Sequence, residues 1–362
     1  MGLPTPRSGL EMQAAACPLC GAAEERFLFW ARDRMHHVEG SFRVVQCRRC
    51  SMVYLSPRPT REAMARYYPS DAYYSYHTSS PSRRTGFARA VKDVLKAAIA
   101  GVHLGYHQGP ALRVSRRRWR RALLWVFTAL VRHRLCQFLP PAKWGRRILD
   151  VGCGAGLCLD YAREFGWETY GVDIDEAAVA RARRSGHNAA MGELEELGYA
   201  SDSFDVVRIW HTLEHLPDPR RAVREAHRIL RPGGRLWLEV PNISSAAARL
   251  FRSRWFALDA PRHLQSFCPR TLWQMLHEAG FREITVGTYQ AAQELASSMW
   301  YVLEDIGLRP KGRLGNALMI ASLLLCKPLS LALTLVRLGD RLTATAVKAT
   351  EAAAPSSEGG GN

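Results

Sequence analysis

A nine-residue stretch, ILDVGCGAG from Ile148 to Gly156, limits the possible folds of this 362-residue chain more than any other. Its apolar start is typical of a strand buried on both faces, and the LCLDYAREFG that follows has helical spacing and a glycine stop. The glycines between them allow positive φ angles and let the backbone approach a ligand closely. The helix would point its unpaired N–H groups at that ligand. The stretch therefore predicts a strand–loop–helix unit for a nucleotide-like cofactor.

A second acid narrows the class of cofactor. The segment ETYGVDID contains Asp173, 17 residues after Gly156, where doubly wound folds hold the hydroxyl groups of a ribose. Enzymes that bind nicotinamide dinucleotides share this acid, but their loop reads G-x-G-x-x-G. Here the spacing is G-x-G-x-G, Leu157 takes the third dinucleotide position, and Asp150 precedes the loop. The spacing argues against a pyrophosphate cradle; a tight turn without a ligand is the alternative.

The rest of the chain alternates strand-like and helical segments, which indicates an α/β fold. Helices of about 10 to 15 residues between short strands imply a parallel sheet with both faces covered. The ligand of such a sheet lies beyond the carboxyl ends of the strands, at the switch point. We expect strands at 148–151, 168–175, 188–191, 203–210, 235–240 and 282–289, and helices at 157–166, 176–186, 218–234 and 269–281.

The stretch DVGCGAG resembles the first motif of class I S-adenosylmethionine (SAM)-dependent methyltransferases. The resemblance implies a Rossmann-like seven-stranded sheet that closes with an antiparallel hairpin of its sixth and seventh strands. DRLTATAVKA, residues 340–349, is the candidate seventh strand because it alternates and is β-branched. Residues 291–339 are then an apolar insertion within the hairpin.

The same resemblance implies a place for each part of SAM. The loop glycines would pass the methionine moiety, and Asp150 would order the loop or meet the ammonium group. Asp173 would hold the ribose hydroxyls, Ile174 would pack on the adenine, and Glu193 would lie near the adenine amino group. The predicted cofactor-binding residues are Asp150, Gly152, Gly154, Gly156, Asp173, Ile174 and Glu193.

Four cysteines near the start of the chain predict a metal site. CPLCG contains Cys17 and Cys20, CRRC contains Cys47 and Cys50, and 26 residues separate the two pairs. Two such knuckles supply four thiolates to a tetrahedral zinc ion, and a site with four protein ligands is structural because no position is left for water. RFLFWARD and SFRVVQC read as short strands between the knuckles, as in a zinc ribbon. A redox pair or chance spacing is the alternative.

The cysteine knuckles, the PRPTREAMARYYPSDAYYSYH after them and the SAM core together resemble a bacterial subgroup of zinc-ribbon methyltransferases. Its relatives include deoxysugar C-methyltransferases and ubiquinone-pathway O-methyltransferases. The likeness covers residues 17–80, 145–290 and the last strand. We expect a disordered N-terminus (1–16), a zinc ribbon (17–57), a linker or lid with Tyr73, Tyr74 and Tyr76 (58–80), a basic amphipathic helical segment (81–144), the SAM-binding core (145–290), the apolar helical insertion (291–339), the last core strand (340–350) and a disordered tail (351–362).

Candidate catalytic residues follow the predicted strand at 203–210. Methyl transfer from a sulfonium is an in-line displacement, so the protein must position the nucleophile and remove its proton. HTLEHLPDP supplies His211, Glu214 and His215. Histidine titrates near neutral pH, so we predict His215 as base or orienter, with Glu214 as its partner or a contact to SAM. In ubiquinone-type relatives the matching stretch, E-x-x-E-H, is thought to hold a divalent metal. A metal bound by His211, Glu214 and His215 is therefore an open alternative here. The stretch could also merely cap a loop.

A second candidate histidine follows the predicted strand at 235–240. DAPRHLQSF contains His263, which we expect at the same edge of the sheet. Arg262 beside it could hold an acidic or phosphorylated substrate. The alternative is a loop histidine with its hydrogen bonds satisfied.

The formal charge of +17 is concentrated in one block. Residues 81–147 hold sixteen Lys/Arg and one acid, Asp93. RRRWRRALLWVFTALVRHR within this block brackets ten mostly apolar residues, 122–131, too few for the roughly 20 that cross a bilayer but typical of an interfacial helix. The apolar segment 314–336 is interrupted by Lys327-Pro328, so we expect a re-entrant or surface hairpin, with a membrane span as the alternative. A solvated charged face, or contacts to nucleic-acid phosphates, are the alternatives.

These features together predict a SAM-dependent methyltransferase with a small-molecule or lipid-linked acceptor: a sugar, quinone or polyketide-like compound, methylated on oxygen or carbon. MGLPTPRSGLEMQ does not read as a signal peptide and the nine cysteines are odd in number, so we expect the cytoplasm, at the inner face of the membrane. An RNA methyltransferase is the alternative, although no Asn/Asp-Pro-Pro-aromatic tetrapeptide follows residues 203–210. A non-catalytic partner protein would need a degraded cofactor loop, and this loop is intact.

Overall fold

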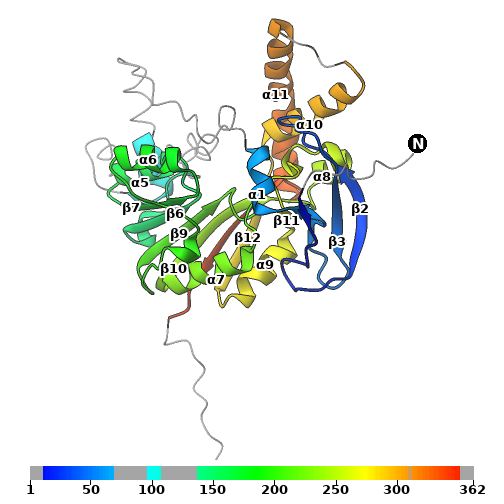
Figure 1. The fold of residues 1–362 in the computed structure, drawn as a ribbon. Helices are drawn as coiled ribbons and strands as arrows, with labels where there is room; N and C mark the ends of the chain where they lie inside the picture. Colours follow the sequence, from blue (N-terminus) through cyan, green and yellow to red (C-terminus); the bar gives the residue numbers. More distant parts are fainter. Residues whose placement is uncertain (1–10, 69–95, 107–136, 309, 311, 351–362) are drawn as a thin grey trace, which may run out of the picture. The chain divides into compact units, whose positions relative to one another are not determined.

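The computed structural model describes residues 11–68, 96–106, 137–308, 310 and 312–350, which form two compact units (Figure 1). Unit 1 contains the described residues up to 68 together with 209–227 and 236–349. Unit 2 contains the described residues from 96 to 208 together with 228–235 and Thr350. The predicted interfacial helix at 122–131 and the three tyrosines at 73, 74 and 76 lie outside the described residues.

The largest sheet has seven strands in the order β12-β13-β10-β9-β6-β7-β8. The chain runs from β6 outward to β7 and β8 and then returns to the other side of β6 with β9, so the strand order reverses at β6. The last two strands in the chain, β12 and β13, are neighbours, as the class I methyltransferase fold requires. The predicted fold class is therefore confirmed. The strands are β6 (Arg147–Val151), β7 (Glu168–Asp173), β8 (Asn188–Met191), β9 (Phe204–Trp210), β10 (Leu230–Pro241), β12 (Arg282–Tyr289) and β13 (Arg341–Val347).

In unit 2 the strands β6, β7 and β8 are parallel. Ile148 and Leu149 of β6 are completely buried, as expected for a strand covered on both faces. The helices α5 (Leu157–Glu164) and α6 (Glu176–Arg184) pack against these strands. The side chain of Asp175 accepts the N–H of Ala178 and so caps α6. Short 3₁₀ helices precede β6 (η4, Ala142–Trp144) and follow β8 (η5, Leu194–Glu196).

Helix α7 (Pro219–Ile229) begins where the sequence predicts and ends earlier. The side chain of Asp218 accepts the N–H of Arg221 at 3.0 Å and so caps the helix. The predicted helix extended to residue 234, but β10 already begins at Leu230. The reason is local: Pro232 has no N–H to donate, and Gly233 has a φ of +79°, which lies outside the helical region.

The hairpin of β12 and β13 is antiparallel, with Thr285 opposite Thr345. The helices α10 (Ala292–Asp305) and α11 (Gly312–Leu335) lie between these strands in the chain and pack against each other. The expected interruption at Lys327-Pro328 is wrong, because α11 is a single helix of 24 residues with Pro328 inside it. A proline removes one helical hydrogen bond. The turns around it gain two others, since the hydroxyls of Ser330 and Thr334 donate to the carbonyls four residues earlier.

The N-terminal part of unit 1 is a four-stranded sheet in the order β11-β4-β3-β2. Two of its strands coincide with the predicted ribbon strands, whereas β11 is contributed by residues far along the chain and pairs antiparallel with β4. Phe42 and Tyr67 are completely buried beside this sheet, with their rings edge to face at 5.6 Å. The remaining elements of unit 1, including these strands, are β1 (Met12–Gln13), β2 (Glu25–Ala31), β3 (Phe42–Cys47), β4 (Val53–Leu55), β5 (Arg58–Pro59), α1 (Arg61–Met64), η1 (Ala65–Tyr67), α8 (Ala246–Phe251), η6 (Arg252–Arg254), η7 (Phe256–Leu258), β11 (Gln265–Ser266) and α9 (Pro269–Glu278).

Candidate functional site

The glycine loop after β6 has the backbone conformation for which glycine is needed. The φ angle is +76° at Gly152, +51° at Gly154 and +89° at Gly156, a region that glycine enters without strain. At Gly156 an added Cβ would also lie 2.9 Å from Cδ2 of His187, closer than real Cβ contacts. The next residue begins α5, so the loop and the helix N-terminus form one continuous turn.

Asp173 joins the end of β7 to this loop. One carboxylate oxygen accepts the N–H of Gly154 at 2.8 Å, and the other accepts the N–H of Asp175 at 3.0 Å. Burial raises the pKa of Asp173, and the backbone hydrogen bonds act against that rise. A carboxylate has about four acceptor positions, so capacity remains for the ribose hydroxyls that the resemblance places here.

Asp150 is buried at the end of β6, only 1% exposed, and is paired with an arginine. Its Oδ1 accepts a hydrogen bond from Nη1 of Arg208 at 2.8 Å, and Nη2 of Arg208 donates to the carbonyl of Gln137 at 3.2 Å. Burial raises the pKa of Asp150, and the charge of Arg208 acts in the opposite direction. Of the two roles considered for Asp150, ordering of the loop fits this buried pairing better than contact with a ligand.

The two other predicted cofactor residues follow strands of unit 2. Ile174 comes directly after β7 and is 69% exposed. Glu193 comes shortly after β8 and directly precedes η5. An exposed apolar side chain at the end of a parallel strand is a suitable surface for a flat base, so the position of Ile174 is compatible with adenine packing.

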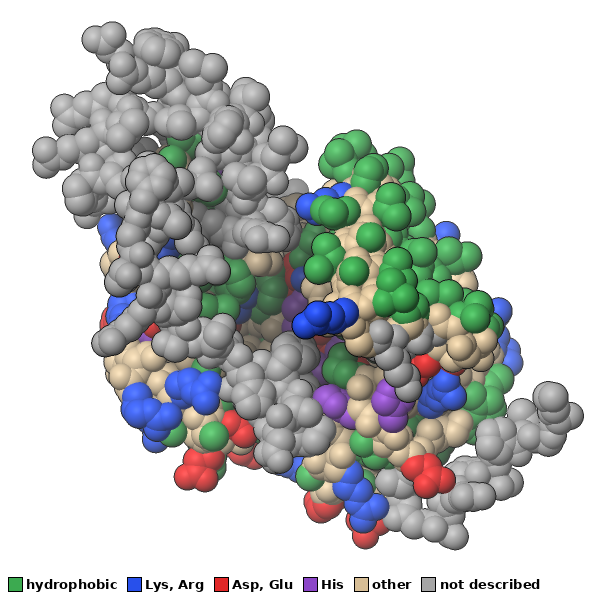
Figure 2. All heavy atoms as spheres, turned by 90° about the horizontal axis from the view of Figure 1, so that it is seen from above, with side chains coloured by type: hydrophobic (Ala, Val, Ile, Leu, Met, Phe, Trp, Pro, Cys, Tyr) green, Lys and Arg blue, Asp and Glu red, His purple; other side chains and the backbone are tan. Residues whose placement is uncertain are grey.

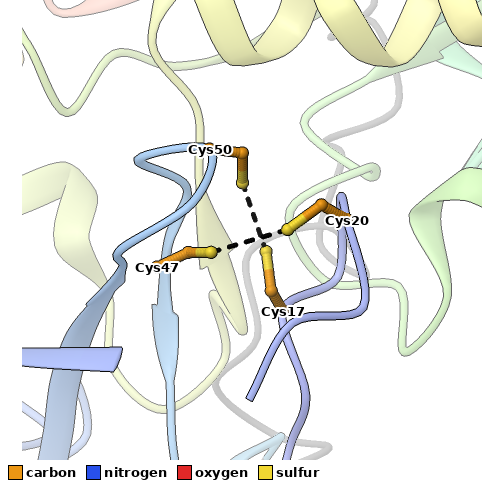
Figure 3. Close-up of side chains that lie close together, drawn as sticks. All are labelled: Cys17, Cys20, Cys47 and Cys50. Atoms are coloured by element: carbon orange, nitrogen blue, oxygen red, sulfur yellow. Dashed lines mark hydrogen bonds between the residues drawn. The ribbon is translucent and has the colours of Figure 1, made fainter. Parts of the chain in front are cut away.

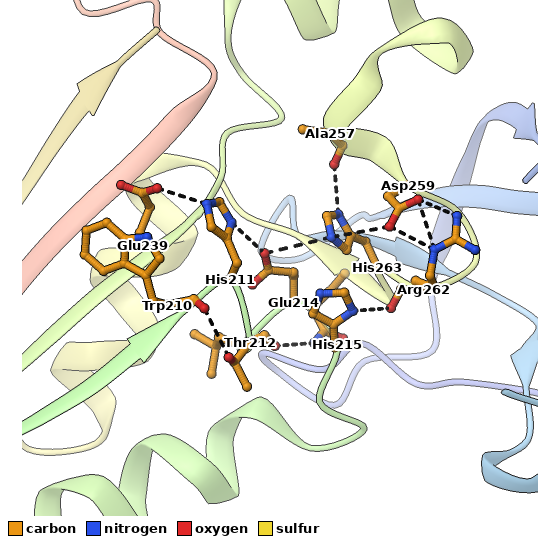
Figure 4. A network of polar contacts seen from close by, with 12 residues as sticks. Trp210, His211, Thr212, Glu214, His215, Glu239, Ala257, Asp259, Arg262 and His263 are labelled. Atoms are coloured by element: carbon orange, nitrogen blue, oxygen red, sulfur yellow. Dashed lines mark hydrogen bonds and ion pairs between the residues drawn. The ribbon is translucent and has the colours of Figure 1, made fainter. Parts of the chain in front are cut away.

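A second cluster lies in unit 1, where residues after β9 meet residues before β11 (Figure 4). The N–H of Leu264 donates to the carbonyl of Glu214 at 2.9 Å. The side-chain amide of Gln265 donates to the carbonyls of two further residues of the first segment at 2.8 and 2.9 Å. These bonds bring the rings of His215 and His263 to a centroid distance of 4.6 Å. The four predicted catalytic residues therefore lie together, in two segments far apart in sequence.

Backbone carbonyls fix the tautomers of the two neighbouring histidines. Nδ1 of His215 lies 3.1 Å from the carbonyl of Arg262 and 3.0 Å from the hydroxyl of Tyr68, and Nδ1 of His263 lies 2.9 Å from the carbonyl of Ala257. A carbonyl oxygen only accepts, so both Nδ1 atoms carry hydrogen and each Nε2 keeps a lone pair when its ring is neutral. Burial, and then the proximity of His263, lower the pKa of His215 to about 4. His215 is therefore neutral at neutral pH.

His211, the fourth predicted catalytic residue, differs because both of its ring nitrogens face carboxylates. Nδ1 lies 3.2 Å from Oε1 of Glu214, and Nε2 lies 2.9 Å from Oε1 of Glu239 (Figure 4). Burial disfavours a charge on His211, but the hydrogen bonds to the two acids outweigh it and raise its pKa to about 9. Burial alone would raise the pKa of Glu214, but the hydrogen bond from His211 and the nearby histidines outweigh it and lower this pKa to about 2. At neutral pH His211 is a charged link between two ionised acids, which does not suit a base.

Glu239 is a site residue that the sequence analysis missed. It lies on β10, is completely buried, and accepts hydrogen bonds from Nη1 of Arg341 at 2.9 Å and from the hydroxyl of Tyr289 at 3.2 Å. It is the one acid in the apolar run RLWLEV. A charged residue in a strand covered on both faces requires a partner, and that signal was available.

The prediction that Arg262 holds a substrate is wrong. Arg262 is completely buried, and its N–H groups donate to the carboxylates of Asp33 and Asp259 and to the carbonyl of Tyr67, at 2.5 to 3.1 Å. The two acids neutralise the guanidinium and occupy its donors, so none faces a ligand. Arg262 instead ties three segments of unit 1 to one another.

Glu214, His215 and His263 also have the geometry of a small cation site. Their donor atoms lie within 4.8 Å of one another. Oε2 of Glu214 is buried and has no hydrogen-bond partner among the described residues. Two imidazoles and one carboxylate suit a divalent transition metal, so the residues fit one. The set differs from the one considered from the sequence, because His263 takes the place of His211.

The four N-terminal cysteines converge on one point (Figure 3). Their sulfur atoms all lie within 4.8 Å of one another, with 3.4 Å between Cys17 and Cys50 and 3.5 Å between Cys20 and Cys47. All four are free thiols. Tetrahedral zinc with bonds of about 2.3 Å separates its sulfurs by roughly 3.8 Å, so this cage fits a zinc ion without rearrangement.

Comparisons with known proteins find similarity to methyltransferases. A family model described as a methyltransferase domain matches residues 117–286. A probable S-adenosylmethionine-dependent methyltransferase of Mycolicibacterium smegmatis is 35% identical over 151 residues, which cover 41% of this chain and 57% of that protein. A ubiquinone biosynthesis O-methyltransferase of Pseudomonas aeruginosa is 34% identical over 133 residues, which cover 35% of this chain and 55% of that protein. The chain thus spans little more than half the length of these curated relatives.

A solved structure of a SAM-dependent methyltransferase from Archaeoglobus fulgidus aligns with 62% of this chain and 93% of that chain, at 22% identity and a TM-score of 0.41. The matched family region contains the glycine loop, Asp173 and both histidine-bearing segments. The strand order is that of the class I SAM-dependent methyltransferase fold, and residues 117–286 match a methyltransferase domain.

Proposed function

We propose that this protein transfers the methyl group of SAM to a hydroxyl or activated carbon of a small-molecule or lipid-linked acceptor, and that the paired histidines His215 and His263 handle the acceptor's proton. The observation that carries the proposal is the fixed tautomer of both rings, which leaves each Nε2 able to accept hydrogen. The relative in Pseudomonas aeruginosa is named for ubiquinone biosynthesis. A phenolic, quinone-like compound is therefore the acceptor to test first.

The two imidazole rings have different roles in this proposal. With centroids 4.6 Å apart, they cannot both be charged at low cost, so the pair takes up one proton. Nε2 of His263 lies 3.9 Å from Oε1 of Glu214 and 3.9 Å from Oδ2 of Asp259, and these acids would stabilise a charged ring there. The pKa of His215, about 4, favours a neutral ring. We therefore assign His263 as the base and His215 as the acceptor's hydrogen-bond partner.

Bound SAM would supply an electrophilic methyl group on a sulfonium centre. Unit 2 would bind SAM through the turn of the glycine loop and the carboxylate of Asp173, which is hydrogen-bonded to that loop. Asp150, directly before the loop, is paired with Arg208. A divalent ion at Glu214, His215 and His263 would take up the Nε2 lone pairs of both rings. In that case the ion, in place of a histidine base, would polarise an acceptor oxygen and lower its pKa. Zinc at the four cysteines would be structural, because four protein ligands leave no position open.

Cofactor binding is tested first by calorimetry with adenosylhomocysteine. Asp173→Ala should weaken binding at least about tenfold, since one hydrogen bond to a charged group contributes about 1.5 to 3 kcal/mol. The matched control is Glu176→Ala, which removes an exposed acid from the first turn of α6 and should leave binding unchanged. No heat with the wild type, or equal binding by Asp173→Ala, would overturn the cofactor assignment.

Acceptor class is tested with methyl-labelled SAM and three separate pools: a catechol of the quinone-precursor type, a total lipid extract and total RNA. Label should enter the first or second pool, and His263→Gln should lower turnover by roughly 10² to 10⁴ while adenosylhomocysteine still binds. His215→Gln should raise KM more than it lowers kcat. Label in RNA alone would favour the RNA methyltransferase alternative instead.

A further inference from the structure

Helix α11 exposes an unusual amount of apolar surface. It is the one helix in the described part of the chain that is long and apolar enough to cross a membrane, and only 11% of its most apolar stretch is buried. It contains no acid, and Lys327 is its only charge after the first turn. Apolar side chains cover one lobe of the surface in Figure 2. The exposed large side chains of this helix and the turn after it are Leu314, Leu318, Ile320, Leu324, Leu325, Leu329, Leu331, Leu335 and Val336.

The side of α11 that faces the protein is less apolar than the side that faces solvent. The inward side carries Ser322, Cys326, Ser330 and Thr334, four residues apart and therefore on one face, together with Met319 and Leu323, which pack against the core. Ser322 accepts from Nε1 of Trp300 at 3.3 Å, Cys326 lies 4.0 Å from the sulfur of Met299, and Thr334 accepts from the N–H of Gln290 at 2.9 Å. A soluble amphipathic helix turns its apolar face to the core. Small and hydroxyl residues at the contact, with leucines outward, are typical of a helix in lipid.

The packing on α10 decides the orientation of α11. Ser322 and Cys326 contact Trp300 and Met299 of α10, and Thr334 contacts Gln290 just before α10. This half of α11 therefore lies against α10 and the segment that leads into it. α10 cannot enter hydrocarbon, because its buried Glu294 and its terminal Asp305 pair with Arg341 and Arg34 of unit 1. The face of α11 opposite α10 remains for lipid. A helix held in this way meets the bilayer with its side, over a length of roughly 36 Å, rather than crossing it.

Charge distinguishes a bilayer from a second copy of the chain as the occupant of this face. Three exposed cations accompany the leucines: Arg313 at the start of α11, Lys327 within it and Arg337 just after it. A second copy docked through the same face would bring these three cations against their own equivalents. An anionic lipid surface is complementary, and each basic residue near it contributes about 1 kcal/mol.

From these observations we propose that the leucine face of α11 lies in the surface of an anionic lipid bilayer, with Lys327 at the level of the headgroups, and holds the protein there. Neither the cofactor nor the acceptor enters this inference, so it stands independently of the proposed function. It places the protein on a membrane through a helix whose lipid-facing side is already exposed in the folded state.

The test is flotation of the full chain with vesicles of phosphatidylglycerol and phosphatidylcholine, compared with phosphatidylcholine alone. The wild type should float with the anionic vesicles. The triple variant Leu324→Gln, Leu325→Gln, Leu331→Gln should lower the bound fraction at least about tenfold. The control is Leu250→Gln, which changes a leucine of α8 that is 73% exposed, and it should float like the wild type. Retained adenosylhomocysteine binding would show that the triple variant is folded.

Two further results decide between occupants and orientations. A dimer in light scattering that the triple variant dissociates, without recruitment to vesicles, would overturn the proposal in favour of a second copy. Labelling with a membrane-impermeant amine reagent should modify Lys327 on vesicles, because its ammonium group lies among the headgroups. Protection of Lys327 would mean a crossing helix, since it lies roughly 12 Å from the end of α11, and would overturn the surface orientation. Equal flotation of the wild type and the triple variant would overturn the whole proposal.

Discussion

Raising the pH from 6.5 to 9 should destabilise the protein by about 3 kcal/mol through one residue, His211. Its contacts with Glu214 and Glu239 raise its pKa to about 9 in the folded state, whereas the unfolded value is about 6.5. The folded protein therefore keeps a proton that the unfolded chain has already lost. At about 1.36 kcal/mol per pKa unit, the difference amounts to about 3 kcal/mol. This stabilisation is fully present below pH 6.5, falls as the pH rises, and is gone above pH 9.

The assay is urea unfolding at a series of pH values between 6 and 9.5. Wild type should lose the stated stability over this window, and His211→Gln should lose little of it, because glutamine does not titrate. His187→Gln is the matched control: His187 is also a buried histidine, but burial lowers its pKa, so its pH dependence falls below 6.5. Parallel curves for the wild type and His211→Gln between pH 6.5 and 9 would refute the reasoning.

Three further predictions concern buried partners and metals. Arg208→Met should lower the free energy of unfolding in urea by about 3 to 5 kcal/mol, because it leaves Asp150 buried and unpaired. Adding Asp150→Asn should recover part of that loss, and equal stability of the wild type and Arg208→Met would contradict the pairing. Cys47→Ser should abolish zinc binding, so elemental analysis of the purified variant should find no zinc and its thermal midpoint should fall. Full zinc occupancy in the variant would contradict a four-thiolate site. A chelator that abolishes turnover reversibly, with recovery on adding a divalent ion, would show a cation at Glu214, His215 and His263; unchanged turnover would leave proton transfer to His263 alone.

Local sequence signals predicted the α/β core well, because its elements are set by neighbouring residues. The strand at 282–289, the N-cap at Asp218 and the glycines of the loop follow from alternation, capping and backbone freedom. The end of α7 was placed too late, since the helical spacing continued into a segment that Pro232 and Gly233 prevent from being helical.

Contacts between distant segments could not be predicted in the same way. Nothing near residue 265 indicates that it adds a strand to a sheet formed by residues 25–55. The identity of Arg262 suggested a ligand, because the sequence does not show that Asp33 and Asp259 enclose it. His211 was considered with the other histidines for its spacing, and only its contact with Glu239 separates its role from theirs.

The ties made by Arg262 mean that the ribbon cannot be an interchangeable module. This one side chain bridges Asp33 beyond β2, the backbone at Tyr67 and the turn that bears His263, while β11 completes the ribbon's own sheet. Removing the first 68 residues would take away Asp33 and the carbonyl of Tyr67, leave Arg262 with Asp259 alone, and loosen the turn that bears the adjacent His263. A change in the ribbon would thus alter the histidine turn without touching it directly.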